Sequence, residues 1–241
     1  SRFSHTDPEL CINGINRELN AGAEQLHRVS WLLVTFGTAY VYSLRETGKV
    51  VANCHKLPAS LFDRRRVGVD EMLRGWIPLI ERLSGSNPEL RIMFTVSPIR
   101  HLRDGAHENQ LSKSVLLLFV DELCRMYPDR CIYFPSYEIV MDELRDYRFY
   151  DAGMTHPNEQ AIRYIWERFS EACFSEETRT LNREWERLEK ALNHRPLTPD
   201  KDTFRDFTVQ NLFKLKKIRE KYSYFDLSKE IDSLELFLKT L

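Results

Sequence analysis

The sequence predicts a mixed α/β domain built around a parallel β-sheet and followed by a helical tail. Three short apolar runs carry this prediction, at residues 31–36, 92–96 and 132–134. None of them alternates polar with apolar residues, which is typical of strands buried on both faces. Helical patterns at about residues 69–83 and 110–126 separate the runs. Strands and helices therefore alternate as in βαβ units with right-handed crossovers.

Weaker signals surround this framework. Asp7 is placed to cap a helix whose apolar stripe comprises Leu10, Ile15, Leu19 and Leu26. The run at residues 50–53 is either a side strand or an extended loop. Pro78 is expected to kink or interrupt its helix, because proline lacks the backbone N–H. The basic run Arg64–Arg66 is interpreted as a solvated loop or a helix start.

The character of the chain changes after about residue 174. We therefore expect an α/β domain at residues 1–174 and a helical appendage at residues 175–241. The appendage has apolar stripes near residues 181–192, 207–218 and 227–241, among many charges. Such amphipathic helices need a surface to cover. We expect them to cap the sheet domain or to pair with a second chain.

Composition excludes several functional classes. A formal net charge of −1 gives no support for a nucleic-acid or anionic-membrane surface. No apolar run approaches the roughly 20 residues of a membrane-spanning helix. The five cysteines are odd in number and none forms C-x-x-C, which argues against a zinc knuckle or a thioredoxin-like motif. We expect a reducing, cytoplasmic location, no metal and no cofactor.

Sites in parallel sheets form beyond the carboxyl ends of the strands. After the first strand, Gly37 allows a tight turn in which the Thr38 and Ala39 amides would face an anion or oxyanion. A plain strand-to-loop turn explains the same residues equally well. Asn53 carries side-chain amide hydrogens that would suit a developing oxyanion. Cys54 next to His55 is poor evidence for a thiol nucleophile, because neighbours in an extended strand point to opposite faces.

Two further segments follow strands or precede helices. Ser97 follows the second strand without a G-x-S-x-G elbow, so it is interpreted as part of a pocket wall. Pro157 is expected at the first position of a helix over residues 157–169, which places His156 at its amino end. The positive end of that helix would favour a neutral imidazole, as a general base near neutral pH requires. A capping histidine is the alternative.

Several ordered strings resemble the GSCFA family of bacterial proteins, over roughly residues 1–172. They are Leu33–Tyr42, Gly48–Pro58, Thr95–Pro98, Ser112–Val115, Met154–Asn158 and Tyr164–Phe169. That family is similar to SGNH/GDSL hydrolases, whose fold is a flavodoxin-like three-layer α/β/α sandwich with a parallel sheet. The resemblance therefore implies this fold for the chain, with C-terminal helices added.

The resemblance also implies ester hydrolysis by a serine, a histidine base and oxyanion donors. By position, His156 matches the base and the turn at Gly37 and Thr38 matches the oxyanion donors. Asn53 is the hypothesis for a further donor. The family's acid usually lies three residues before the histidine, where this chain has Gly153, so Asp151 or a backbone carbonyl would orient the imidazole. The substrate would be a small ester or an acylated carbohydrate.

The Gly-Ser-Cys-Phe-Ala string that should carry the nucleophile does not occur in residues 1–241. We expect this string, and the central first strand that ends at it, upstream of Ser1. Residues 31–36 would then have a bare edge, covered by a helix or a neighbouring molecule or paired with a strand from a second chain. Self-association into a homo-oligomer is the corresponding expectation. A non-catalytic carbohydrate- or protein-binding module on the same fold remains the alternative function.

Overall fold

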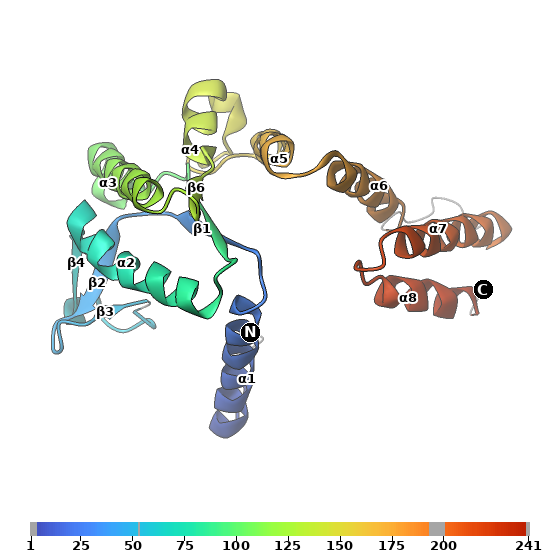
Figure 1. Cartoon of the computed structure of the whole chain (residues 1–241), viewed down its shortest axis with the longest axis horizontal. Coiled ribbons are helices and arrows are strands. Elements are labelled where there is room, and N and C mark those ends of the chain that lie inside the picture. Colours follow the sequence, from blue (N-terminus) through green and yellow to red (C-terminus); the bar gives the residue numbers. More distant parts are fainter. Residues whose placement is uncertain (1–3, 53, 193–200, 240–241) are drawn as a thin grey trace. The chain divides into compact units, whose positions relative to one another are not determined.

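A computed structural model describes residues 4–52, 54–192 and 201–239 of the chain (Figure 1). The chain divides into two compact units, at residues 1–167 and 168–241. The first contains two β-sheets and their helices, and the second consists of helices. Each unit is described by itself.

The first unit is centred on a parallel sheet of three strands. These are β1 (Trp31–Phe36), β5 (Arg91–Val96) and β6 (Cys131–Tyr133), in the order β1-β5-β6. Residue 31 pairs with residue 91 and residue 36 with residue 96, so β1 and β5 end at the same level. Within the described residues β1 pairs with β5 alone. The predicted α/β fold with a parallel sheet is confirmed, and β1 is an edge strand.

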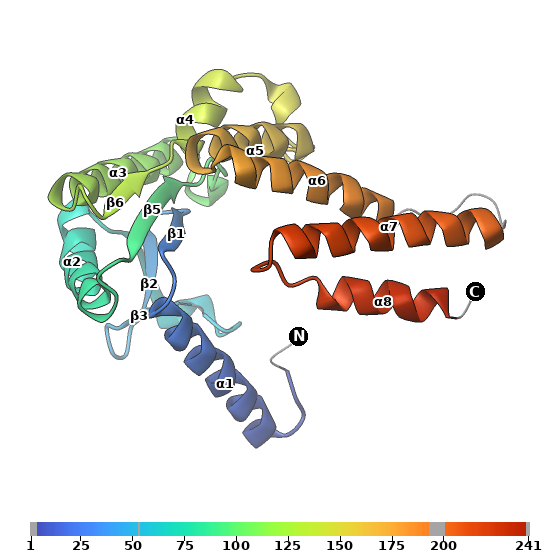
Figure 2. The same ribbon diagram turned by 45° about the vertical axis from the view of Figure 1, so that its right-hand side comes forward.

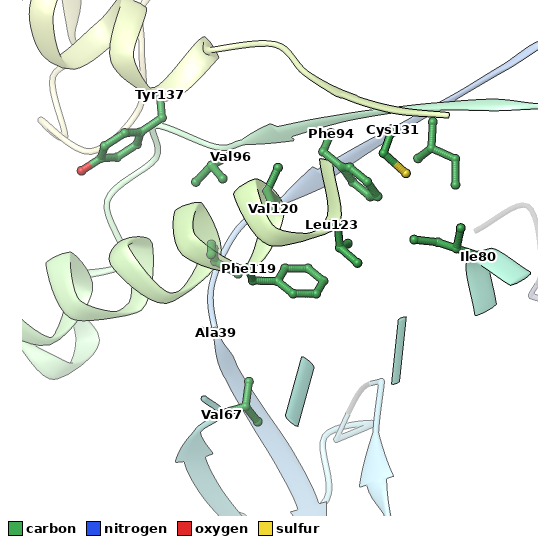
Figure 3. Close-up of a cluster of buried hydrophobic side chains, with 12 residues drawn as sticks. Ala39, Val67, Ile80, Phe94, Val96, Phe119, Val120, Leu123, Cys131 and Tyr137 are labelled. Carbon is green, nitrogen blue, oxygen red and sulfur yellow. The ribbon is translucent and has the colours of Figure 1, made fainter. Parts of the chain in front are cut away.

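Helices α2 (Val69–Ser86) and α3 (Ala106–Met126) cover one face of this sheet. Figure 3 shows Phe119, Val120 and Leu123 of α3 gathered near Phe94 of β5 and Ile80 of α2. All five side chains are buried. The helix α2 runs through Pro78 as one element, so the expected interruption is wrong.

Alternate residues of β1 face the other side of the sheet. Trp31 is 41% exposed and Leu33 is 55% exposed, whereas their neighbours Leu32 and Val34 pack against the core. Ile132 of β6 is 39% exposed and lies in register with Leu33 through Met93. An apolar surface therefore remains open on β1 and β6.

Helix α1 (Pro8–Leu26) precedes β1 and begins at Asp7, whose Oδ1 accepts a hydrogen bond from the Glu9 N–H at 2.9 Å. None of its residues is buried. Ile12, Ile15 and Leu19 share one face by helical spacing and all three are exposed. Leu10 lies on the opposite face, so Ile12 replaces it in the expected stripe.

A second, antiparallel sheet follows β1, and the sequence did not predict it as such (Figure 2). It contains β2 (Tyr40–Leu44), β3 (Val50–Val51) and β4 (Phe62–Arg66), in the order β3-β2-β4, with a 3₁₀ turn at Ala59–Leu61. Tyr42 is opposite Arg64. The run Arg64–Arg66 is thus a strand, and the expectation of a loop or helix start is wrong.

Short helical segments connect the remaining elements. A 3₁₀ turn at Leu102–Asp104 precedes α3. After β6 come α4 (Ser136–Glu138), a π-helical turn at Ile139–Glu143 and a 3₁₀ turn at Tyr147–Phe149. Helix α5 (Glu159–Cys173) begins two residues later than expected. Pro157 forms a β-bridge with Tyr150, and the Asn158 side chain accepts the Ala161 N–H at 3.1 Å. Asn158, not His156, therefore caps this helix.

The second unit has a core of its own. It consists of α6 (Glu176–Leu192), α7 (Lys201–Lys221) and α8 (Ser228–Leu238). The buried side chains of these helices and of the connection between α7 and α8 form one cluster, made of Leu181, Leu188, Leu215, Ile218, Tyr222, Leu227 and Ile231. Lys216 of α7 and Glu235 of α8 form an ion pair at 2.6 Å. The helices thus bury their apolar faces against one another. The sequence had predicted instead that these faces cover the sheet domain or a second chain.

In the part of the chain that the structure describes, no helix is both long and apolar enough to cross a membrane.

Candidate functional site

The carboxyl ends of β1 and β5 lie next to each other and are tied together. The Ser97 N–H donates to the Phe36 carbonyl at 2.9 Å, which extends the strand pairing by one step. The first residues beyond the two strands, Gly37 and Ser97, both direct their carbonyl oxygens to Lys113 of α3. Its Nζ lies 2.6 Å from each oxygen. One buried side chain thus joins the loops that follow two neighbouring strands.

The turn after β1 is fixed by the residue before this lysine. Ser112 is buried, and its Oγ accepts a hydrogen bond from the Ala39 N–H at 2.8 Å. The same oxygen lies 3.1 Å from Thr38 Oγ1, which in turn accepts the Tyr40 N–H at 3.2 Å. The amides of Ala39 and Tyr40 are therefore used within the turn. Within the described residues the Thr38 N–H has no hydrogen-bond partner.

This outcome changes the predicted oxyanion donors. Gly37 and Thr38 lie where the sequence placed them, at the carboxyl end of the sheet. The Ala39 amide, expected beside them, is occupied by Ser112 Oγ and its residue is buried. Asn53 lies outside the described residues. The Thr38 amide is thus a backbone donor of this turn that has no partner among the described residues.

His101 stands over the Gly37 turn. A Cβ atom placed on Gly37 would lie 3.5 Å from His101 Nε2, so the two residues are in contact distance. The His101 N–H donates to Asn109 Oδ1 at 2.9 Å, which holds the loop against α3. Partial burial lowers the pKa of the His101 imidazole, and the positive charges of Lys113, His156 and Arg64 lower it further. The His101 residue as a whole is nevertheless exposed.

His156 and Asp151 come together across a tight turn. The Asp151 N–H donates to the His156 carbonyl at 2.9 Å, and Asp151 Oδ2 lies 3.8 Å from His156 Nδ1. Thr155 Oγ1 is closer to this nitrogen, at 2.9 Å. Among the described residues, His156 Nε2 has no hydrogen-bond partner. The predicted pair is therefore adjacent, but the hydroxyl of Thr155 lies nearer to the imidazole than the carboxylate of Asp151 does.

Both side chains of this pair are open to solvent, because 58% of the His156 side chain and 44% of the Asp151 side chain are exposed. His156 lies three residues before α5 and outside its first turn. The predicted position at a helix start is wrong, because Pro157 is used in the bridge with Tyr150.

Arg100 connects the His156 turn to the loop after β5. Its backbone N–H donates to the Thr155 carbonyl at 3.1 Å. Its guanidinium donates to the Met154 carbonyl at 3.3 Å and to the Tyr150 hydroxyl at 3.1 Å, and it stacks 4.3 Å from the centre of the Tyr150 ring. Met154 has a φ of 57°, which an L-residue rarely adopts. Four interactions from one residue hold this strained turn next to the sheet.

Charged pairs from β2, β4 and α3 border the site. Arg64 binds Asp104 Oδ1 at 2.5 Å and stacks 3.9 Å from the centre of the Tyr40 ring. The Tyr40 hydroxyl donates to Glu108 Oε2 at 2.7 Å, and this hydrogen bond raises the pKa of Tyr40. Arg66 lies 3.4 Å from the same carboxylate. The positive charges of the arginine run are thus balanced locally.

The other predicted residues are not brought to this cluster in a catalytic arrangement. Ser97 Oγ accepts the Ile99 N–H at 3.3 Å within its own loop. His55 and Lys56 have φ values of 49° and 61°, so the segment after Cys54 is a turn and not an extended strand. No group of three or more His, Cys, Asp or Glu side chains in the described ranges could hold a metal ion.

Sequence reasoning missed Lys113 and Arg100, which organise the site. A signal existed for Lys113. It lies three, seven and ten residues before Leu116, Val120 and Leu123, on the apolar face of its helix. A single charge within such a stripe indicates a buried ionisable group. No comparable pattern surrounds Arg100, whose partners Tyr150, Met154 and Thr155 lie about fifty residues away.

Comparison with known families gave two matches. The model of the GSCFA family matches residues 1–169, and the model described as GSCFA domain protein, C-terminal domain, matches residues 185–240. Comparisons with curated proteins and with solved structures gave no match.

Proposed function

The chain belongs to the GSCFA family, and from this premise we propose that it forms most of an ester-hydrolysing domain of the SGNH/GDSL type. The observation that carries the proposal is the arrangement of His156, with Nε2 open and Asp151 near Nδ1. It lies in a turn that Arg100, in the loop after β5, holds through hydrogen bonds to Thr155, Met154 and Tyr150. Base, orienting group and oxyanion donor are three of the four parts of such a site.

The fourth part is a serine nucleophile, which the proposal places in polypeptide upstream of Ser1. His156 Nε2 would take the proton from the serine hydroxyl as its oxygen attacks the ester carbonyl carbon. The Thr38 N–H would stabilise the oxyanion that forms. His156 would then return the proton to the leaving alcohol. Water, activated by the same imidazole, would release the acid from the acyl-serine.

Asp151 would hold the imidazole in the tautomer that leaves Nε2 as acceptor. Its carboxylate lies 3.8 Å from Nδ1, beyond hydrogen-bond distance, and Thr155 Oγ1 occupies the nearer position. Apo sites often have such long contacts, which shorten when substrate binds. The substrate class would be a small ester or an acylated carbohydrate.

The test is hydrolysis of p-nitrophenyl acetate by the protein that includes its upstream segment. His156→Ala is expected to lower kcat/KM by about 10²–10⁴-fold, as for the loss of a general base. His107→Ala is the matched control, since His107 lies in the exposed first turn of α3. Equal activity of wild type and His156→Ala would remove His156 from the mechanism.

A non-catalytic carbohydrate- or protein-binding module is the second candidate. The large exposed fractions of His156 and Asp151 favour it, since catalytic carboxylate–histidine pairs act best when shielded from water. Binding of an acylated sugar without turnover, in the protein with its upstream segment, would select this alternative.

A further inference from the structure

Lys113 is the most unusual charged group of the first unit. Only 1% of it is exposed, and it lies on the buried face of α3 with Leu116 and Val120. No carboxylate among the described residues forms an ion pair with it. A buried ammonium without a counter-ion destabilises the folded state, which suggests that Lys113 has a role beyond packing.

Its two acceptors are equivalent positions of neighbouring strands. Phe36 and Val96 are paired at the ends of β1 and β5, and Gly37 and Ser97 are the next residue of each strand. Lys113 Nζ lies 2.6 Å from both carbonyl oxygens. The ammonium thus stabilises two carbonyls that the end of the ladder leaves without strand partners.

Holding the Gly37 oxygen also fixes the next amide. The peptide bond is planar, and no cis bond occurs among the described residues. In a trans peptide the C=O and N–H point in opposite directions. With the Gly37 oxygen directed to Lys113, the Thr38 N–H is directed away from it, and within the described residues it has no partner. At β5 the next residue is Pro98, which has no N–H to offer.

We propose that Lys113 is a positioning residue that sets the Gly37–Thr38 peptide so that the Thr38 N–H serves as an anion or oxyanion donor. The donor role rests on the proposed function, whereas the peptide orientation does not. Ser112 supports it by holding the next amide, of Ala39, against α3. Two consecutive residues of one helix therefore hold the peptides on either side of Thr38.

The charge of Lys113 gives this role a measurable signature. Burial lowers the pKa of its ammonium to about 8. The titratable group that faces it is His101, from the loop after β5, whose own pKa is lowered below its usual value. Arg64 of β4 and His156 also lower the pKa of His101. A change in the turn near pH 8 would therefore report Lys113.

The experiment is a ¹³C-detected ¹³CO–¹⁵N titration of the ¹³C,¹⁵N-labelled 241-residue chain between pH 6 and pH 10, which follows the Thr38 amide nitrogen without relying on its exchanging proton. The wild-type Thr38 amide is expected to change its chemical shift with a midpoint near pH 8. Lys113→Arg, which remains charged throughout, is expected to abolish this inflection. Lys113→Met is expected to displace the Thr38 resonance at pH 7 to a position outside the wild-type range.

Ser114→Ala is the control on the same helix, because the Ser114 hydroxyl bonds only to the Gln110 carbonyl of its own turn. It should keep the wild-type midpoint. A wild-type Thr38 amide without an inflection between pH 7 and pH 9 would overturn the proposal, and so would an unchanged Thr38 resonance in folded Lys113→Met. Neither result depends on esterase activity. A failure of the esterase test would therefore not change the outcome of this titration.

Discussion

Replacing Lys113 by methionine removes a buried charge and leaves the apolar stem. Each pKa unit corresponds to about 1.36 kcal/mol of interaction that differs between the two protonation states. Lowering the lysine pKa from 10.5 to about 8 therefore means that burying the ammonium costs about 3 kcal/mol at neutral pH. The methionine variant avoids this cost, but it leaves the Gly37 and Ser97 carbonyls without their donor, at about 1–3 kcal/mol each.

The pH dependence separates these two effects, because only the charge depends on pH. The folded-state pKa of Lys113 lies below its unfolded value. Between pH 8 and pH 10.5 the unfolded chain holds a proton that the folded chain has released, so stability rises with pH in this window. Below pH 8 both states carry the proton and the contribution is constant. Between pH 7 and pH 10.5 the free energy of unfolding of the wild type is thus expected to rise by about 3 kcal/mol relative to that of Lys113→Met.

The assay is urea unfolding of both proteins at several pH values, followed by the near-ultraviolet signal of the core around Trp76. Other groups titrate in the same range. Burial raises the pKa of Cys131 to about 11. The folded state therefore becomes less stable as pH rises above the pKa that this thiol has in the unfolded chain. Such terms are common to both proteins and cancel in the difference. A difference that stays constant within about 0.5 kcal/mol would refute the buried-ammonium reasoning.

Two further predictions concern the turn and the sheet edge. Arg100→Gln removes the side-chain hydrogen bonds that hold the His156 turn. In an active enzyme this variant should lower kcat by up to about 10²-fold with little change in KM. The control variant Arg103→Gln should leave kcat and KM unchanged. Leu33→Lys should reduce concentration-dependent self-association of the 241-residue chain, measured by sedimentation, by about 10-fold or more, since edge lysines oppose strand pairing. Leu118→Lys, at an equally exposed position of α3, should leave association unchanged.

The parallel sheet was predictable because its information is local. Each strand is a short apolar run, and the alternating helices carry their own apolar stripes, so element type and order follow from periodicity. Polar strands gave no such signal. In β4 the burial alternates, with Arg64 and Arg66 partly buried and Arg65 exposed. The pairing with β2, and the carboxylates Asp104, Glu71 and Glu108, stabilise this triple-arginine strand.

The site was predictable in its location and not in its connections. Gly37 and Thr38 follow the end of β1, as the apolar run at residues 31–36 predicted, and ligand binding there stays a prediction. Which amide stays free depends on Lys113, which is 76 residues from Gly37 in sequence. The error at His156 was local: Asn158 is a stronger N-cap than a histidine before proline, and this preference was available from the sequence.

The open edge of β1 connects the fold to the proposed function. Within the described residues the outer edge of β1 has no strand partner, Leu33 on this strand is 55% exposed, and α1 keeps Ile12 and Leu19 exposed as well. Under the proposal, the strand that ends at the nucleophile would pair with β1 and cover this edge. Polypeptide that fills the edge would then abolish the self-association that Leu33→Lys opposes. If the protein with its upstream segment still associates through Leu33, the nucleophile strand does not pair with β1, and the serine of the proposed mechanism would lie too far from His156 to be activated.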